Sequence, residues 1–162
     1  MSDEYNSLVV NNCIKEFQTG NKIKAFNNLK NYINNNPKDS KAIYNFALMA
    51  EEVDKIEIAI KNYLIVNKID KNNWRSRFNL YLIYIKQKDY QKALILINSV
   101  LKIKPRYQPA LRDKALVYYY QNKPDEGKKT VEESIELNDK DYIAYNILGL
   151  NLGSLKMYKE AK

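Results

Sequence analysis

Apolar residues recur along the chain at intervals of three and four, in short runs separated by polar segments. One run contains Phe78, Leu82 and Ile85, and the next begins at Tyr90 and Ala93. This spacing puts the apolar side chains on one face of an α-helix. Turn-forming residues interrupt successive runs at Thr19-Gly20-Asn21, Val53-Asp54-Lys55, Gln87-Lys88-Asp89 and Gln121-Asn122-Lys123-Pro124. The pattern therefore predicts a succession of helix pairs.

A fixed period relates these helix pairs to one another. Ala25, Ala59 and Ala93 are equally spaced along the chain, and the same step leads to Gly127 and Ala161. A small residue at all five positions indicates internal repeats, which stack into solenoids. We expect a single solenoid domain over residues 1–162, made of repeats 6–39, 40–73, 74–107 and 108–141 and the partial repeat 142–162.

A helix-turn-helix repeat of about 34 residues resembles the tetratricopeptide repeat (TPR) family. The resemblance extends over residues 6–162 and is clearest in the fifth repeat, at Tyr145, Leu148, Gly149, Leu152, Tyr158 and Ala161. It implies an all-α fold, a right-handed superhelical solenoid of antiparallel helix pairs. In this family the eighth and twentieth positions are small because the two helices cross there. The eighth positions here are Cys13, Ala47, Tyr81, Ala115 and Gly149, and only Tyr81 departs from the rule.

The composition excludes several classes of chemistry. The chain has no His and a single Cys, Cys13, so it lacks the ligands of nearly every zinc, haem or copper site, and no disulfide can form within the chain. No carboxylate pair has a recognisable catalytic arrangement. We therefore expect no enzymatic activity, no cofactor and no metal. Cys13 occupies a small-residue position, which favours a buried packing role.

The net charge of +8 changes this picture little. Residues 81–120 carry +6 of it, but only four of the 27 basic residues are Arg, and the chain is rich in Asn and Ile. This bias indicates AT-rich codon usage rather than specific nucleic-acid binding. The N-terminus lacks the basic start and apolar stretch of a secretory signal, and no segment reaches membrane-spanning length. We expect a cytoplasmic protein that does not bind membranes.

The resemblance implies that the first helices of the repeats line a concave groove. The sixth repeat positions hold Asn11, Asn45, Asn79 and Asp113, a short polar ladder whose carboxamides suit the main chain of an extended peptide. Apolar and basic side chains flank this ladder. The predicted groove residues on those flanks are Tyr44, Phe78, Leu48, Leu82, Lys41, Arg75 and Arg112.

These residues predict a protein-interaction scaffold that binds a partner segment, mildly acidic and with apolar side chains, in the groove. The two-carboxylate clamp that some TPR domains use for chaperone tails needs Lys, Asn and Arg in successive repeats. Only its Asn element is present, as Asn45 or Asn79. Arg75 alone cannot hold two carboxylates, so we do not expect this clamp.

Two alternatives remain open. TPR-like arms are fused to transferase domains, so the chain could be the substrate-recruiting N-terminal arm of a larger enzyme. Helix-pair repeats of the pentatricopeptide type bind RNA, but their slightly longer period would drift along this chain. The fifth repeat stops after its first helix, with Leu148, Leu152, Leu155 and Tyr158 near one face. We expect the chain to be a fragment of a longer protein, with Leu155 and Tyr158 frayed or buried in self-association.

Overall fold

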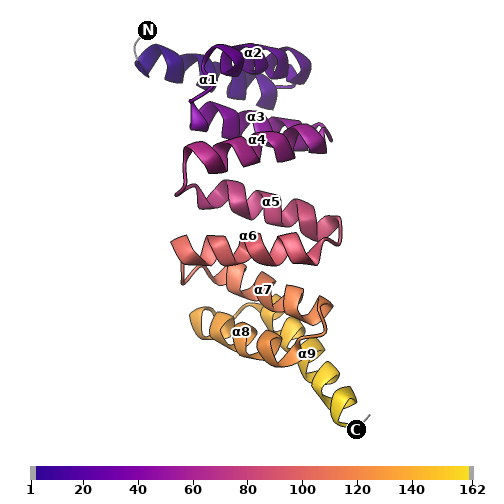
Figure 1. Ribbon diagram of the computed structural model, residues 1–162. Helices are drawn as coiled ribbons and strands as arrows, with labels where there is room; N and C mark the ends of the chain where they lie inside the picture. The colour runs from indigo at the N-terminus through magenta and orange to yellow at the C-terminus, as the bar shows by residue number, and fades with distance from the viewer. Residues whose placement is uncertain (1–2, 161–162) are drawn as a thin grey trace. The chain divides into compact units, whose positions relative to one another are not determined.

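The computed structural model describes the backbone of residues 3–160 and the side chains of residues 7–157 and 159–160. Within these residues the chain forms α-helices and no strand, so the predicted all-α class is confirmed (Figure 1). The helices are α1 (Asp3–Gln18), α2 (Lys22–Asn35), α3 (Ser40–Glu52), α4 (Ile56–Ile69), α5 (Trp74–Lys86), α6 (Tyr90–Ile103), α7 (Gln108–Tyr120), α8 (Pro124–Leu137) and α9 (Tyr142–Glu160).

The helix boundaries follow the period of the sequence. Helices α2, α4, α6 and α8 begin at residues 22, 56, 90 and 124, each one repeat period after the last. Helices α3, α5, α7 and α9 begin at residues 40, 74, 108 and 142, with the same step. The helix pairs predicted from the apolar pattern are therefore present.

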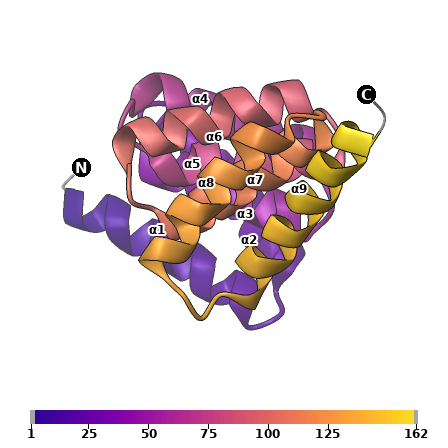
Figure 2. The ribbon, with the colours of Figure 1, turned by 90° about the horizontal axis from the view of Figure 1, so that it is seen from below.

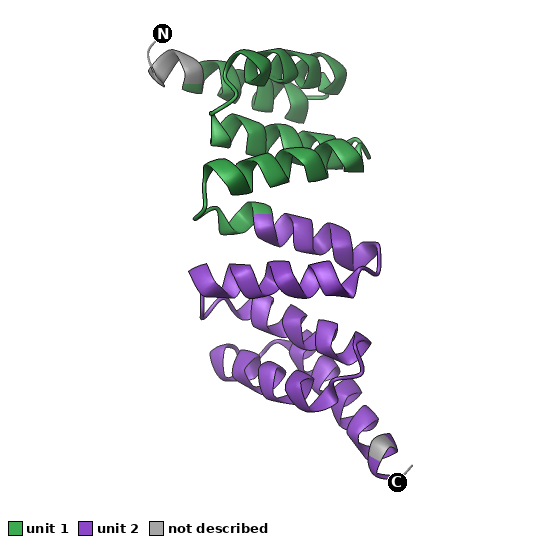
Figure 3. Ribbon diagram, viewed as in Figure 1, with its two compact units in different colours: residues 1–76 green, residues 77–162 purple. Residues whose placement is uncertain are grey.

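The chain divides into two compact units, residues 1–76 and residues 77–162, and the boundary falls inside α5 (Figure 3). In unit 1, α1 packs against α2 and α3, α2 also contacts α3, and α3 packs against α4. In unit 2, α7 packs against α6 and α8, and α9 packs against both α7 and α8 (Figures 1 and 2). The single solenoid domain stays a prediction.

The same backbone turn joins the two helices of each pair. One residue has left-handed dihedrals, with φ of 103° at Gly20, 57° at Asp54, 59° at Lys88 and 55° at Asn122. The next residue donates its N–H to the carbonyl five positions earlier, as in Asp89 to Tyr84 at 2.9 Å. This hydrogen bond is typical of the Schellman motif that ends helices. The sequence predicted where these turns fall, and the structure adds that one residue in each is strained unless it is Gly.

Replacing Lys88 with Gly is expected to stabilise unit 2. A side chain in the left-handed region costs roughly 1–2 kcal/mol, and the entropy of Gly in the unfolded chain offsets part of the gain. The free energy of unfolding, measured by chemical denaturation, should rise by about 0.5–1 kcal/mol. The matched control is Lys102→Gly inside α6, which should lower it by about 1 kcal/mol. A loss of stability in both variants would contradict the strain argument.

The alanines at the predicted crossing positions lie in the core. Ala25, Ala59 and Ala93 are fully buried, and so are Ala47 and Ala115.

The single cysteine also lies in the core. Cys13 is buried. Burial is the main reason why the pKa of its thiol is raised, and the nearby negative charge of Glu16 raises it further. The predicted packing role of Cys13 is therefore confirmed. Tyr81, the exception to the small-residue rule, is also buried, and its ring stacks on Phe78 with centroids 5.6 Å apart.

No helix packs closely against Gly149 in the described part of the chain. Gly149 is exposed, and a Cβ there would meet open space. Helix α9 instead packs on α7 and α8 through another face, where Ala144 and Ile147 join Ala115 and Val131 in one apolar cluster. The small residue at position 149 therefore has no packing role within the described part of the chain.

Helices α8 and α9 approach closely at Gly127. A Cβ on Gly127 would clash with Oδ1 of Asn151. Asn151 is fully buried, and its Nδ2 donates to the carbonyl of Ile147 at 2.9 Å. Its Oδ1 has no hydrogen-bond partner among the described residues. The fit of Asn151 against α8 therefore depends on the missing side chain at position 127.

Gly127→Ala should lower the free energy of unfolding by about 1–3 kcal/mol through overpacking. In an Asn151→Ala background the same change should cost little, because the clash is gone and Ala favours the helix by roughly 1 kcal/mol. A double-mutant cycle read by thermal unfolding measures this coupling. Gly153→Ala in α9, where a Cβ meets open space, is the control and should not destabilise. Additive effects of the Gly127 and Asn151 changes would refute the contact.

Helix α9 continues through Glu160. It therefore does not end near Lys156, which lies one repeat period after the left-handed residue Asn122. Several of its apolar side chains are accessible, including Tyr142 (73% exposed) and Met157 (72%), whereas Leu155 is half-buried. The side chain of Tyr158 and the residue Ala161 lie outside the described residues. No helix in the described part of the chain has the length and apolar character needed to cross a membrane.

Candidate functional site

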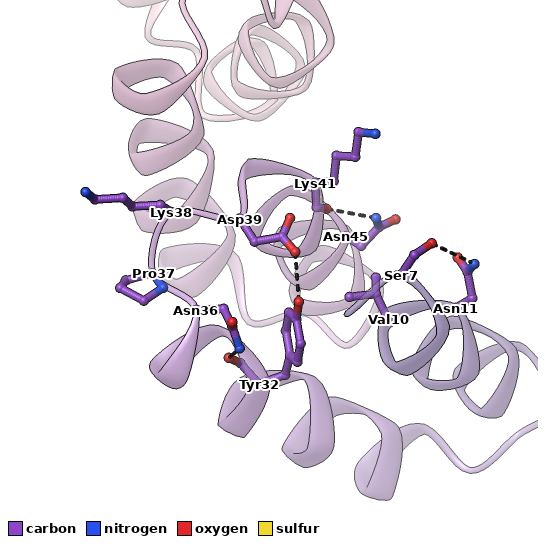
Figure 4. Close-up of a pocket in the computed structure, with 10 residues that line it drawn as sticks. All are labelled: Ser7, Val10, Asn11, Tyr32, Asn36, Pro37, Lys38, Asp39, Lys41 and Asn45. Carbon is purple, nitrogen blue, oxygen red and sulfur yellow. Dashed lines mark hydrogen bonds between the residues drawn. The ribbon is translucent and has the colours of Figure 1, made fainter. Parts of the chain in front are cut away.

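A pocket of about 580 Å³ lies in unit 1 between α1, the end of α2, the turn that follows it, and α3 (Figure 4). Three of the predicted groove residues, Asn11, Lys41 and Asn45, are among those that line it. The complete lining is Ser7, Val10, Asn11, Tyr32, Asn36, Pro37, Lys38, Asp39, Lys41 and Asn45.

Helix geometry brings the two asparagines to this pocket. Ser7, Val10 and Asn11 are spaced by three and four positions, so they share one face of α1, and Lys41 and Asn45 share a face of α3 in the same way. Because α1 contacts α3, these faces meet across the pocket. Figure 4 shows the carboxamide of Asn45 beside Lys41 of α3 and that of Asn11 beside Ser7 of α1.

Each carboxamide keeps groups that a ligand could bind. Nδ2 of Asn45 donates to the carbonyl of Lys41 at 2.9 Å, and Nδ2 of Asn11 lies 3.5 Å from Oγ of Ser7. An Asn side chain has two N–H donors and an acceptor oxygen. The second N–H and the Oδ1 atom of each residue make no hydrogen bond among the described residues. The pocket therefore offers donors and acceptors on both walls.

The turn between α2 and α3 is fixed by its own hydrogen bonds. Oδ1 of Asp39 accepts the N–H of Ala42 at 3.0 Å and so caps α3, and Oδ2 accepts the hydroxyl of Tyr32 at 3.0 Å. The side chain of Asn36 donates to the carbonyl of Tyr32 at 2.9 Å. Both carboxylate oxygens of Asp39 thus form hydrogen bonds within the fold, one to α2 and one to α3.

The electrostatic character of the pocket is basic. Lys38 and Lys41 are exposed and form no ion pair among the described residues. Asp39 is the acidic residue of the lining, and its oxygens already accept two hydrogen bonds. A ligand carboxylate would therefore meet two free ammonium groups with little opposing charge.

In unit 2 the predicted groove residues Arg112 and Asp113 bind one another. Nε of Arg112 donates to Asp113 at 2.9 Å, and Nη1 of Arg112 donates to Asp141 at 3.2 Å. Gln108 also donates to Asp141, at 2.7 Å. The side chains of Arg112, Asp113 and Asp141 are only 21%, 14% and 9% exposed. The cluster joins α7 to the start of α9 and leaves little of either predicted residue for a ligand.

The two carboxyl groups of this cluster are perturbed in opposite directions. Burial raises the pKa of Asp113, and the attraction of Arg112 offsets only part of that effect. Burial also acts on Asp141, but hydrogen bonds from Gln108, Arg112 and the N–H of Ala144 outweigh it and hold the pKa of Asp141 below its usual range. Asp141 is therefore the carboxylate that the fold stabilises in its charged form.

Asp141→Asn should lower the free energy of unfolding at neutral pH by about 1–2 kcal/mol, because one amide group cannot accept all of these hydrogen bonds. The folded pKa lies below the unfolded one, so the contribution is complete above about pH 4 and is lost as the pH falls through the folded pKa. Denaturation at a series of pH values should show the difference from wild type shrinking in acid. The control Asp139→Asn, at an exposed position, should leave the free energy of unfolding unchanged at every pH. A difference independent of pH would contradict the assignment.

The remaining predicted residues do not line the pocket. In unit 1, Tyr44 packs its ring 5.9 Å from that of Tyr63, Leu48 is partly exposed, and the guanidinium of Arg75 lies 4.7 Å from the ring of Trp74. In unit 2, Asn79 and Leu82 are half-buried, and Phe78 packs edge-on against Tyr107 at 5.5 Å.

The sequence interpretation missed Tyr32, Asn36, Lys38 and Asp39 as lining residues. They come from the end of a second helix and from the turn between repeats, whereas the family pattern assigns groove contacts to first helices. The signal that could have found them is the inter-repeat turn, which lies beside the next first helix in every repeat. Within the described residues, no group of three His, Cys, Asp or Glu side chains could hold a metal ion.

Comparison with known proteins yields one curated relative and many similar structures. No protein-family model matches the chain. The photosystem I assembly protein Ycf3 of Rippkaea orientalis is 28% identical over 110 residues, which cover 66% of this chain and 64% of that protein. The chain thus spans less than two thirds of the length of the relative that it matches.

Two solved structures illustrate the similarity of fold. A tetratricopeptide repeat protein from Parabacteroides merdae has a TM-score of 0.86 at 18% identity, over 97% of this chain and 62% of that one. The first TPR of Spaghetti (RPAP3), bound to the HSP90 peptide SRMEEVD, has a TM-score of 0.67 at 20% identity, over 72% of this chain and 93% of that one. The chain therefore has the tetratricopeptide repeat fold, which is the fold implied by the resemblance drawn from its repeat period.

Proposed function

We propose that the chain is a protein-interaction scaffold and that the pocket of unit 1 binds an extended segment of a partner protein. The observation that carries this proposal is the pair of carboxamides, Asn11 and Asn45, on facing helices with unused donors and acceptors. A peptide main chain presents a matching N–H and C=O at every residue. The pair could therefore bind a segment without reading its side chains.

The flanking side chains define the chemistry of the preferred segment. Lys38 and Lys41 favour acidic residues, and Val10 contributes an apolar contact. The ligand that fits best is a mildly acidic segment with apolar side chains. Charge attraction of this kind mainly accelerates association and selects partners, while main-chain hydrogen bonds hold the segment in place.

The known proteins support this proposal by analogy. The structure of Spaghetti (RPAP3) contains a bound peptide, SRMEEVD, which is rich in acidic residues, and the curated relative is an assembly protein. Carried over to this chain, both favour binding of other proteins over catalysis. The two-carboxylate clamp is still not expected here, because its basic residues are missing from the sequence.

Four further features predicted from the sequence stay predictions. These are the transferase arm, RNA binding, the cytoplasmic location and self-association through the fifth repeat. The reading frame of the gene beyond residue 162 tests the first of them. A scaffold and a recruiting arm would use the same pocket, so the experiment below applies to both.

Asn11→Ala combined with Asn45→Ala should weaken peptide binding by about 2–4 kcal/mol, at one to two for each hydrogen-bonding group lost. The probe is the tightest binder selected from a random peptide display library, titrated calorimetrically against the whole chain. Helicity should not change, because both residues face the pocket.

Asn27→Ala combined with Asn31→Ala is the matched control. Both residues are exposed on α2 and neither lines the pocket, so this pair should bind the peptide as the wild type does. Unchanged affinity in the Asn11 and Asn45 variant would assign binding to another face of the protein.

A further inference from the structure

Unit 1 has a second groove, of about 450 Å³, formed by α2, α3 and α4. Pro37, in the turn after α2, is the residue that it shares with the pocket of the proposed function. The groove is lined by Lys30, Ile33, Asn34, Pro37 and six further residues of α3 and α4. It is therefore a separate surface of the same unit.

The groove has an apolar floor and apolar walls. Ile43 and Phe46 of α3 form the floor, where each is only 3% exposed, and the ring of Phe46 is held 4.5 Å from that of Phe26. Ile58 of α4 is 36% exposed on the wall. Burial of such surface under another apolar group contributes about 25 cal/mol per Å².

Helix α4 carries more apolar surface than the fold covers. Nine of its 14 residues are apolar, and of these only Ala59, Tyr63 and Val66 are fully buried. A helix that is apolar on nearly every side indicates contact with a further element. Ile58 and Ile65 are two helical turns apart, so they form one stripe along the groove wall.

The rim of the groove is basic. Lys30 on α2 and Lys61 on α4 stand on opposite walls, both exposed. Neither forms an ion pair among the described residues, and the lining contains no Asp or Glu. An apolar ligand flanked by carboxylates is the complement of this surface, because it meets two unpaired positive charges and no negative one.

We infer that this groove binds an amphipathic helix of a partner protein, with its apolar face on the isoleucines of α2 and α4 and acidic residues beside Lys30 and Lys61. Helical walls favour a helix as the occupant, since side-chain ridges of one helix pack into the grooves between others. This surface and this ligand differ from the extended segment assigned to the pocket of Asn11 and Asn45. The two sites allow one unit to hold two segments.

The probe is a synthetic peptide amide with Leu at i, i+3, i+4 and i+7 and Glu at its other positions, compared with a second peptide that has Lys in place of Glu. Both are titrated against the whole, isotope-labelled chain by NMR. The acidic peptide should bind at least about tenfold more tightly than the basic one. Its binding should shift the methyl signals of Ile33, Ile58 and Ile65.

Charge reversal on the protein tests the same contact from the other side. Lys30→Glu with Lys61→Glu should weaken the acidic peptide about tenfold and strengthen the basic one. The matched control, Lys15→Glu with Lys71→Glu, makes the same change in net charge in unit 1 at exposed residues outside both pockets. It should leave the preference for the acidic peptide intact.

Three results would overturn the inference. They are equal affinity for the two peptides, equal effects of the two double variants, and methyl shifts that fall around Val10 of the other pocket instead of the groove isoleucines. The last result would refute binding in the groove while supporting binding in the pocket of Asn11 and Asn45. Failure of this inference and failure of the proposed function can therefore be distinguished. If circular dichroism shows that the reversed variant is unfolded, the comparison of the two peptides on the wild-type chain decides alone.

Discussion

The close crossing of paired helices is the constraint on which the rest of the structure depends. Ala25, Ala59 and Ala93 are completely buried at the positions where the repeat pattern places the crossing of each pair, and a larger side chain there would push the helices apart. Contact between successive repeats is equally close at Gly127 of α8, where even a methyl group would clash with Asn151 of α9. Each crossing fixes how one helix is rotated against the next. It thereby decides which residues of the first helix face a ligand and which face the core.

This constraint is local and periodic, which is why the fold could be predicted from the sequence. The small residue and the left-handed turn recur at one register, so a single repeat specifies its neighbours, and the helix starts at residues 22, 56, 90 and 124 follow. Gly149 shows the limit of the argument. A small residue in the correct register forms no crossing when no helix packs against that side of it, and the sequence alone does not show which side is covered.

The candidate site was only partly predictable, because much of it depends on side chains that do not follow the period. The repeat register places Asn11 and Asn45 at equivalent positions of successive repeats, and both line one pocket. It gave no sign that Asp39 would be held by Tyr32, or that Arg112 would turn to Asp141, 29 residues away. Each contact lies within a single repeat and involves its last residue, and the partner of that residue differs from one repeat to the next. Side-chain geometry at such contacts comes from packing and not from spacing.

The distribution of paired and unpaired charge gives the positive net charge a meaning that composition alone does not. In unit 1 the acidic side chains largely serve the fold: Glu52 pairs with Lys22, Glu16 pairs with Lys24, Glu51 accepts the hydroxyl of Tyr63, and Asp39 caps α3. The lysines of both pockets have no such partner among the described residues. Codon bias can account for how many lysines the chain has. Their positions are a separate matter. Lys38 and Lys41 line one pocket and Lys30 and Lys61 line the other, and this arrangement supports the proposal of an acidic partner for both surfaces.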